Sequence, residues 1–176
     1  MSPSWRRVAA VGALVGVLAS GTACGKEDAS GVASKNIKTL PADLVKGPVL
    51  NLAVTAEDVA EDVAGSGDSN SYIAAVGMYA LRDGDKLEAT LQVSKFTDKA
   101  RPKEADFQNQ VATQIGGTKA QRFRMGDHSV FRSSGRKQSI ASWFTGNYYF
   151  VLSVRDAYPT PRTLLRKLIM EVRPND

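Results

Sequence analysis

Few residues of this chain have side chains suited to catalysis. Its 176 residues include one cysteine, Cys24, and one histidine, His128. A hydrolase needs a nucleophile, a general base and a group that orients the base, and His128 is the single histidine that could be that base. Asp127 and Ser129 flank it, but neighbouring side chains in a turn or strand diverge, so consecutive residues do not assemble a triad. The sequence therefore predicts no catalytic site, and a hydrolase stays only a third hypothesis.

Metal and cofactor motifs are also not found. The segment Asp83-Gly84-Asp85 is too short for a calcium loop and lacks the distal glutamate. His128 has no second histidine and no free cysteine to share a zinc ion. Gly116-Gly117 ends a predicted helix instead of opening one, so its amides cannot cradle a phosphate. We predict no metal and no nucleotide cofactor.

The N-terminus has the parts of an export signal. Arg6 and Arg7 give it a positive start, and Val8 to Leu18 form an uncharged, mostly apolar run. That run is shorter than the roughly 20 residues that a spanning helix needs. We therefore expect cleavage, by the general or the twin-arginine route. Trp5 before the arginine pair and Ala9 after it favour the general route.

The cleavage site points to a lipid anchor. Gly21-Thr22-Ala23-Cys24 resembles a bacterial lipobox, although Gly21 stands where that motif usually has leucine. A lone cysteine in an exported chain cannot form an internal disulfide. The resemblance implies diacylation, with palmitate as a typical acyl chain. We expect residues 1–23 to be a signal peptide and Cys24 to become the lipidated N-terminus on the extracytoplasmic face of the cell membrane.

Charge is unevenly distributed along the mature chain. Loss of Arg6 and Arg7 lowers the formal net charge from +5 to +3, and residues 100–176 hold 13 basic and 6 acidic side chains. A basic half near a membrane favours anionic lipid head groups or acidic wall polymers. The alternative is that scattered arginines only solvate the sheet. The candidate surface for an anionic partner consists of Arg122, Arg124, Arg132, Arg136 and Lys137.

The first half of the mature chain predicts a tether, a short helix and a hairpin. Residues 24–39 are rich in small and polar side chains and predict a flexible tether, followed by a single domain over residues 40–176. Thr55 and Asp58 resemble a capping box for an acidic helix from Ala56 to Ala64. Strands are expected at Tyr72–Arg82 and Lys86–Thr97, joined by Asp83-Gly84, with one face apolar and the other wet.

The second half predicts two amphipathic helices around further strands. Phe107, Val111 and Ile115 recur at helical spacing after Pro102. Strands are expected at Ala120–Met125, Ser129–Ser133 and Gln138–Arg155. The last of these folds back at Gly146-Asn147, so that Phe144 faces Tyr149 and Trp143 faces Phe150. A final helix begins at Pro161 after an N-cap at Thr160, and its expected buried stripe is Leu164, Leu165, Leu168, Ile169 and Val172.

The element order is helix-ββ-α-ββββ-α. It predicts an α+β domain with a mainly antiparallel sheet of about five to six strands and two main helices, packed chiefly on one side. With the signal, Cys24, Leu40-Pro41 and the aromatic tail Trp143-Phe144, the chain resembles small lipoproteins of unassigned function from high-GC Gram-positive (actinobacterial) bacteria. The resemblance implies attachment to the cytoplasmic membrane and carries over no active site.

The leading functional hypothesis is a non-enzymatic binding or assembly module of the cell envelope. Its partner would be an envelope protein, an anionic lipid or a wall polymer, and nucleic acid is not expected. The alternative is a carrier that holds a lipid or small hydrophobic ligand under the helix of Phe107, Val111 and Ile115. A deep apolar cavity there would favour this second hypothesis.

Overall fold

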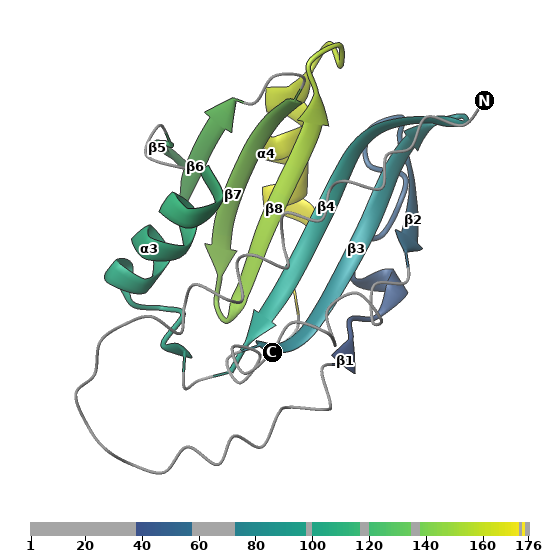
Figure 1. The fold of residues 1–176 in the computed structure, drawn as a ribbon. Helices are drawn as coiled ribbons and strands as arrows, with labels where there is room; N and C mark the ends of the chain where they lie inside the picture. The colour runs from purple at the N-terminus through teal and green to yellow at the C-terminus, as the bar shows by residue number, and fades with distance from the viewer. Residues whose placement is uncertain are drawn as a thin grey trace, which may run out of the picture.

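The computed structural model describes residues 38–57, 73–97, 100–116, 120–134, 138–172 and 174. The expected signal peptide, Cys24 and residues 25–37 of the expected tether lie outside these residues, whereas the last two tether residues, Lys38 and Thr39, form strand β1. These residues form a sheet-dominated α+β fold with eight strands and two main helices (Figure 1). The strand count is larger than expected, because the sequence analysis missed β1 and β2.

Seven of the strands pair in a single row. Their order is β1-β3-β4-β8-β7-β6-β5, and β2 lies beside β1 along the same edge of β3. Pairing is antiparallel throughout except between β1 and β3. The strands are β1 (Lys38–Thr39), β2 (Ala53–Glu57), β3 (Ile73–Asp83), β4 (Lys86–Phe96), β5 (Gln121–Met125), β6 (His128–Ser134), β7 (Gln138–Thr145) and β8 (Tyr148–Arg155).

Three hairpins share one turn design. In each, two residues connect the strands and the first is a glycine at positive φ: Gly84 at 55°, Gly126 at 60° and Gly146 at 57°. Glycine adopts this conformation without the steric cost that a Cβ would add. The expected register after Gly146 is confirmed, because Phe144 pairs with Tyr149 and Trp143 pairs with Phe150.

The expected helix from Ala56 to Ala64 is wrong where it can be checked. Ala56 and Glu57 belong to β2, whose backbone pairs with Met78 to Arg82 of β3. Pairing along a whole strand outweighs a local capping signal, because it satisfies the backbone groups that the cap would have served. The rest of that segment lies outside the described residues.

The two main helices cover opposite faces of the sheet. Helix α3 (Ala105–Gly116) lies in front of β6 and β7 in Figure 1, whereas α4 (Pro161–Glu171) lies behind β7 and β8. The expectation of helices chiefly on one side is therefore wrong. The physical reason is that both faces of the sheet carry apolar side chains, so each face needs a cover. We call the two sides the α3 face and the α4 face.

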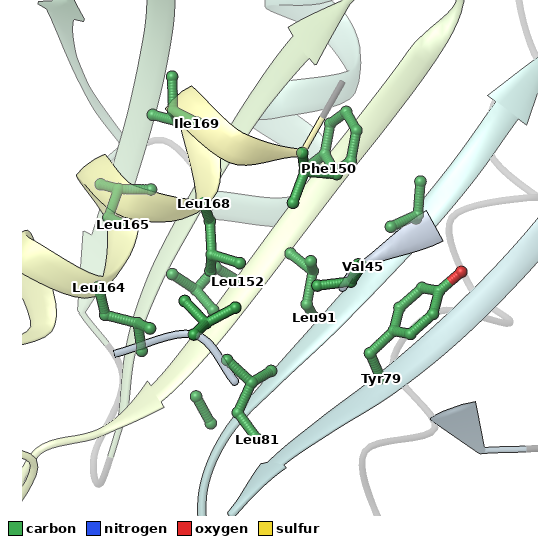
Figure 2. Packing of buried hydrophobic residues seen from close by; sticks show 14 of the residues in the cluster. Val45, Tyr79, Leu81, Leu91, Phe150, Leu152, Leu164, Leu165, Leu168 and Ile169 are labelled. Carbon is green, nitrogen blue, oxygen red and sulfur yellow. The ribbon is translucent and has the colours of Figure 1, made fainter. Parts of the chain in front are cut away.

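The larger core lies on the α4 face. Leu164 and Leu168 of α4 are fully buried and point toward Leu152 and neighbouring sheet residues (Figure 2). A 3-10 turn, η2 (Ala42–Leu44), and the segment after it close the other end of this core. Leu40, just before η2, passes close over β3, because a Cβ at Gly77 would lie 3.0 Å from the Leu40 Cβ.

The smaller core lies on the α3 face. Phe107 packs edge-on against Phe96, with ring centroids 5.2 Å apart, and also contacts Phe144 at 6.2 Å. Val111 is fully buried in the same cluster. We expected one face of β4 to be exposed to solvent along its whole length. This expectation is wrong, because Phe96 and Ser94 lie on that face and are both buried.

Candidate functional site

Two open clefts lie on opposite faces of the sheet. The first, on the α4 face, lies between the start of α4 and strands β5 to β7 and has a volume of about 330 Å³. The second, on the α3 face, crosses β2, β3, β4, β8 and β7 and has a volume of about 250 Å³. We call them the basic cleft and the mixed-charge cleft.

The basic cleft contains two arginines from different elements. Arg132 comes from β6 and Arg162 from the first turn of α4, and both side chains are exposed. Its lining contains no carboxylate, although Asp156 accepts a hydrogen bond from the Ser139 hydroxyl at the rim (3.5 Å). The lining residues are Gln121, Phe123, Arg132, Ser139, Ile140, Ala141, Pro161, Arg162 and Leu165. Exposed guanidinium groups above an apolar floor suit a phosphate or carboxylate group on a larger partner.

The arginines of the expected anionic-partner surface do not share one face. Gln121 pairs with Arg132 and Arg122 with Phe131, so the side chains of Arg122 and Arg132 point to opposite sides of the sheet. Arg122 donates a hydrogen bond to the Ser129 hydroxyl (2.9 Å), and its guanidinium lies 5.8 Å from the centre of the Phe131 ring.

Arg124 lies two residues along β5 from Arg122 and therefore on the same α3 face. Arg136 and Lys137 lie outside the described residues. Arg162, in the first turn of α4, is the residue that the structure brings close to Arg132.

His128 opens strand β6 and is half-buried. Its Nδ1 lies 3.1 Å from the backbone carbonyl oxygen of Phe144. A carbonyl can only accept, so Nδ1 donates the proton in this contact. The contact explains His128 as a structural residue that ties the start of β6 to β7.

The mixed-charge cleft is built on a β-bulge. Leu81 pairs with Ala89 and Arg82 pairs with Leu87, so Glu88 is the extra residue of β4. Glu88 is only 4% exposed, and its Oε1 forms an ion pair with the Lys86 ammonium. Its second carboxylate oxygen, Oε2, is buried and has no hydrogen-bond partner. Sequence patterning alone treats Glu88 as a solvated residue.

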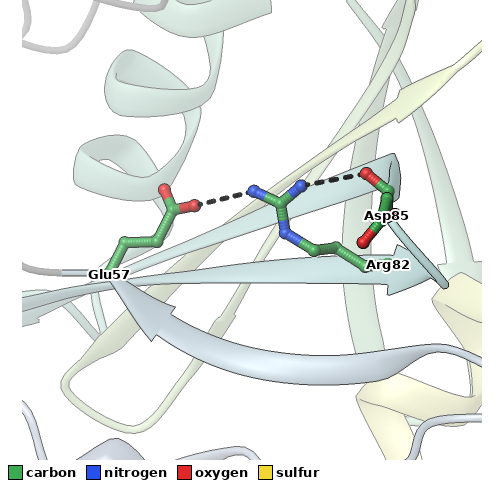
Figure 3. Close-up of polar contacts among 3 residues, drawn as sticks. All are labelled: Glu57, Arg82 and Asp85. Atoms are coloured by element: carbon green, nitrogen blue, oxygen red, sulfur yellow. Dashed lines mark hydrogen bonds and ion pairs between the residues drawn. The ribbon is translucent and has the colours of Figure 1, made fainter.

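The two arginines of this cleft, Arg82 and Arg155, have different environments. Arg82 contacts Glu57 (Nη2 to Oε1, 3.5 Å) and the backbone carbonyl of Asp85 (3.4 Å), as Figure 3 shows. Arg155 is half-buried and donates a long hydrogen bond to the Leu87 carbonyl (3.5 Å). The full lining is Glu57, Met78, Arg82, Leu87, Glu88, Ala89, Thr90, Gln138, Ser153 and Arg155.

Two buried tyrosines have raised pKa values. Burial, and secondarily the negative charge of Asp43, raises the pKa of Tyr79 to about 12 from its usual 10.0. Burial also raises the pKa of Tyr149 well above the usual tyrosine range. Both hydroxyls are therefore neutral at physiological pH, and neither residue lines the two clefts.

Among the residues that the structure describes, no group of three or more His, Cys, Asp or Glu side chains is arranged to hold a metal ion. None of the helices in this part of the chain combines the length and apolar character needed to cross a membrane.

Comparison with models of protein families, with curated proteins and with solved structures finds no match to this chain.

Proposed function

We propose that this chain is an exported lipoprotein whose folded domain is a non-enzymatic binding module at the outer surface of the cytoplasmic membrane. In this proposal the acyl chains on Cys24 hold the protein at the membrane. The basic cleft then contacts a phosphate-bearing component of the envelope, either a lipid head group or a wall polymer. The observation that carries the proposal is the convergence of Arg132 and Arg162 in a cleft whose lining contains no carboxylate.

Charge and exposure support a large anionic partner for this cleft. Arg132 and Arg162 are both solvent-exposed, so a partner can reach them without displacing core residues. Arg166, which is also exposed, lies one turn further along α4 from Arg162. A guanidinium group can donate two parallel hydrogen bonds to the oxygens of one phosphate. Several such contacts together strengthen the attraction to a negatively charged surface.

The predicted tether allows this contact. A chain extends by at most about 3.5 Å per residue, so residues 24–38 could span roughly 50 Å. That reach exceeds the size of the domain, for which the radius of gyration is expected to be about 15 Å. A lipid on Cys24 would therefore leave the domain free to turn its basic cleft toward the membrane or toward the wall.

The alternative functions have less support. A carrier of hydrophobic ligands would need space beneath α3, where the rings of Phe96, Phe107 and Phe144 pack against one another. A hydrolase would need His128 to meet a carboxylate and a hydroxyl. The contact that His128 makes through Nδ1 is to the backbone carbonyl of Phe144.

The proposal can be tested with vesicles and a matched control. The Cys24→Ala chain, which cannot be acylated, is mixed with phosphatidylglycerol vesicles, phosphatidylcholine vesicles or soluble polyphosphate at low salt. The double variant Arg132→Glu/Arg162→Glu reverses the charge of the basic cleft. The control Arg122→Glu/Arg124→Glu makes the same change of net charge on the opposite face of the sheet.

We expect the basic-cleft variant to lose at least tenfold in affinity and the control to lose much less. Binding should also weaken as salt is raised, because screening reduces the attraction. Phosphatidylglycerol binding without polyphosphate binding would identify a lipid head group, and the reverse would identify a polymer. An equal loss in both double variants would refute a dedicated site and indicate attraction by net charge alone.

A further inference from the structure

Strand β5 is the last strand of the sheet, and one of its edges has no partner strand among the described residues. It pairs with β6 on one side, and no other described strand pairs with it on the other side (Figure 1). Such an edge can pair with a further strand, so many proteins protect it with a proline or a bulge. β5 contains no proline, and its pairing with β6 runs without a register shift. Its outer edge can therefore accept another strand.

The hairpin geometry identifies the backbone groups that face outward. Two residues connect β5 to β6, and Met125 pairs with the first residue of β6 across this turn. The pair that flanks a two-residue turn is hydrogen-bonded, and such pairs alternate with non-hydrogen-bonded pairs along an antiparallel ladder. The backbone groups of Met125, Phe123 and Gln121 therefore face β6. The N–H and C=O groups of Arg122 and Arg124 face the outer edge.

The side chains of β5 give this edge two different faces. Arg122 and Arg124 lie on the α3 face, and both are exposed. Within the described ranges neither of them forms an ion pair with a carboxylate. Phe123 and Met125 lie on the α4 face, where they are half-buried and pack against the larger core. A strand beside β5 would meet positive charge on one face and apolar surface on the other.

Charge decides which kind of strand fits this edge. If β5 of a second copy paired with it, arginines of the two copies would lie opposite one another on the same face. Like charges directly opposite destabilise a strand pair, whereas opposite charges stabilise it. A complementary strand therefore has carboxylates opposite Arg122 and Arg124. The residues between these carboxylates are apolar and cover the exposed parts of Phe123 and Met125.

We infer that β5 binds an extended acidic segment of another protein as an added antiparallel strand. Every strand pair from β3 to β5 is antiparallel, and antiparallel pairing is slightly more stable per residue than parallel pairing. Arg122 donates to the Ser129 hydroxyl (2.9 Å) and has further N–H groups for a carboxylate. The inference depends neither on the lipid anchor nor on the proposed function of the basic cleft, so either proposal can fail while the other holds.

Fluorescence anisotropy on the full chain purified in non-ionic detergent tests this inference. The probe is a short labelled peptide in which glutamate and valine alternate, and a version with lysine in place of glutamate reverses its charge. Two further versions are N-methylated, one at the glutamate amides and one at the valine amides. In an antiparallel pair, the residues opposite Arg122 and Arg124 turn their own N–H groups toward β5. Methylation of the glutamate amides therefore blocks the pairing without changing the charge.

Two double variants of the protein complete the test. Arg122→Glu/Arg124→Glu reverses the charge of the β5 edge. The control Lys38→Glu/Lys46→Glu makes the same change of net charge elsewhere. Lys38 lies in β1 at the opposite edge of the sheet, Lys46 follows η2, and both are exposed.

We expect the glutamate-valine peptide to bind the wild type, and the lysine peptide and the glutamate-methylated peptide to bind at least tenfold more weakly. The valine-methylated peptide should bind nearly as well as its parent. Arg122→Glu/Arg124→Glu should lower affinity at least tenfold and the control much less. The peptide series uses only the wild type, so it tests the inference even if a variant fails to fold.

Three results would overturn the inference. The first is absence of glutamate-valine peptide binding to the wild type at millimolar concentration. The second is equal affinity of the two N-methylated peptides, which would indicate attraction by charge without strand pairing. The third is a wild-type dimer that dissociates when the peptide binds, which would assign this edge to a second copy of the chain.

Discussion

Replacing Tyr79 with phenylalanine should destabilise the protein near neutral pH but stabilise it relative to the wild type in strong alkali. The Tyr79 hydroxyl donates a hydrogen bond to the backbone carbonyl of Pro41 (2.9 Å), and its ring lies in the larger core (Figure 2). Loss of one such bond costs about 1 kcal/mol. Near neutral pH, where tyrosine is protonated in both folded and unfolded chains, this is the whole effect of Tyr79→Phe.

The pH dependence follows from the raised pKa of Tyr79. The folded chain holds the phenolic proton more tightly than the unfolded chain, with a pKa of about 12 against 10.0. The resulting stabilisation is therefore fully present below pH 10 and is lost as pH rises through 12. By pH 12 the wild type has lost roughly 2 kcal/mol through this group, whereas phenylalanine has no proton to lose. The two stability curves should cross at about pH 11.

Urea unfolding at a series of pH values measures this crossing. Trp143 is 1% exposed and is the only tryptophan after residue 23, so its fluorescence reports unfolding of the sheet. Tyr149 titrates in both proteins, so its contribution cancels in the difference between them. A difference in free energy of unfolding that stays constant from pH 8 to pH 12 would refute the reasoning about Tyr79.

Two further predictions concern the packing of the domain. Leu168→Ala should lower the free energy of unfolding by about 3 kcal/mol, because Leu168 is fully buried between α4 and the sheet. Met170→Ala on the same helix is the control, since that side chain is 63% exposed and should change stability by less than about 0.5 kcal/mol. Gly146→Ala should destabilise by about 1 kcal/mol, because φ at Gly146 is 57° and a Cβ is strained there. Urea unfolding measures the stability of all three variants. Equal effects at Leu168 and Met170 would contradict the orientation of α4, in which Leu168 faces the sheet and Met170 faces the solvent.

Local turn and helix signals predicted much of the fold. The glycine turns at Gly84, Gly126 and Gly146 fixed the hairpins, and the pairing of Trp143 with Phe150 followed from the last of them. The apolar stripe of α4 and its start at Pro161 are also confirmed. These features depend on residues that are close together in the sequence, which is why the sequence alone predicts them.

Features that depend on distant parts of the chain were missed. Strand β2 exists because it pairs with β3, and nothing near Thr55 indicates that partner. The side on which each helix packs depends on where the chain crosses the sheet, and both faces carry apolar residues such as Phe96 and Leu91.

The candidate sites also combine features that sequence neighbours determine with features that depend on distant parts of the chain. The two-residue turn at Gly126-Asp127 already implies that Arg122 faces Phe131 and not Arg132, so the separation of these arginines could have been read from the sequence. The approach of Arg162 to Arg132 depends on how α4 packs on the sheet, and the contact of Arg155 with the Leu87 carbonyl depends on the pairing of β8 with β4. Burial of Glu88 depends on a bulge that no residue pattern in β4 indicates.

The proposed location at the membrane rests on the processing of the N-terminus. Intact-mass measurement of the protein extracted from membranes tests it most directly. We predict a mature chain that begins at Cys24 and carries the added mass of a diacylglyceryl group, with or without a further acyl chain on its amine. A chain that retains residues 1–23, or one that begins at Cys24 with an unmodified thiol, would contradict the proposal that this protein is a lipid-anchored binding module.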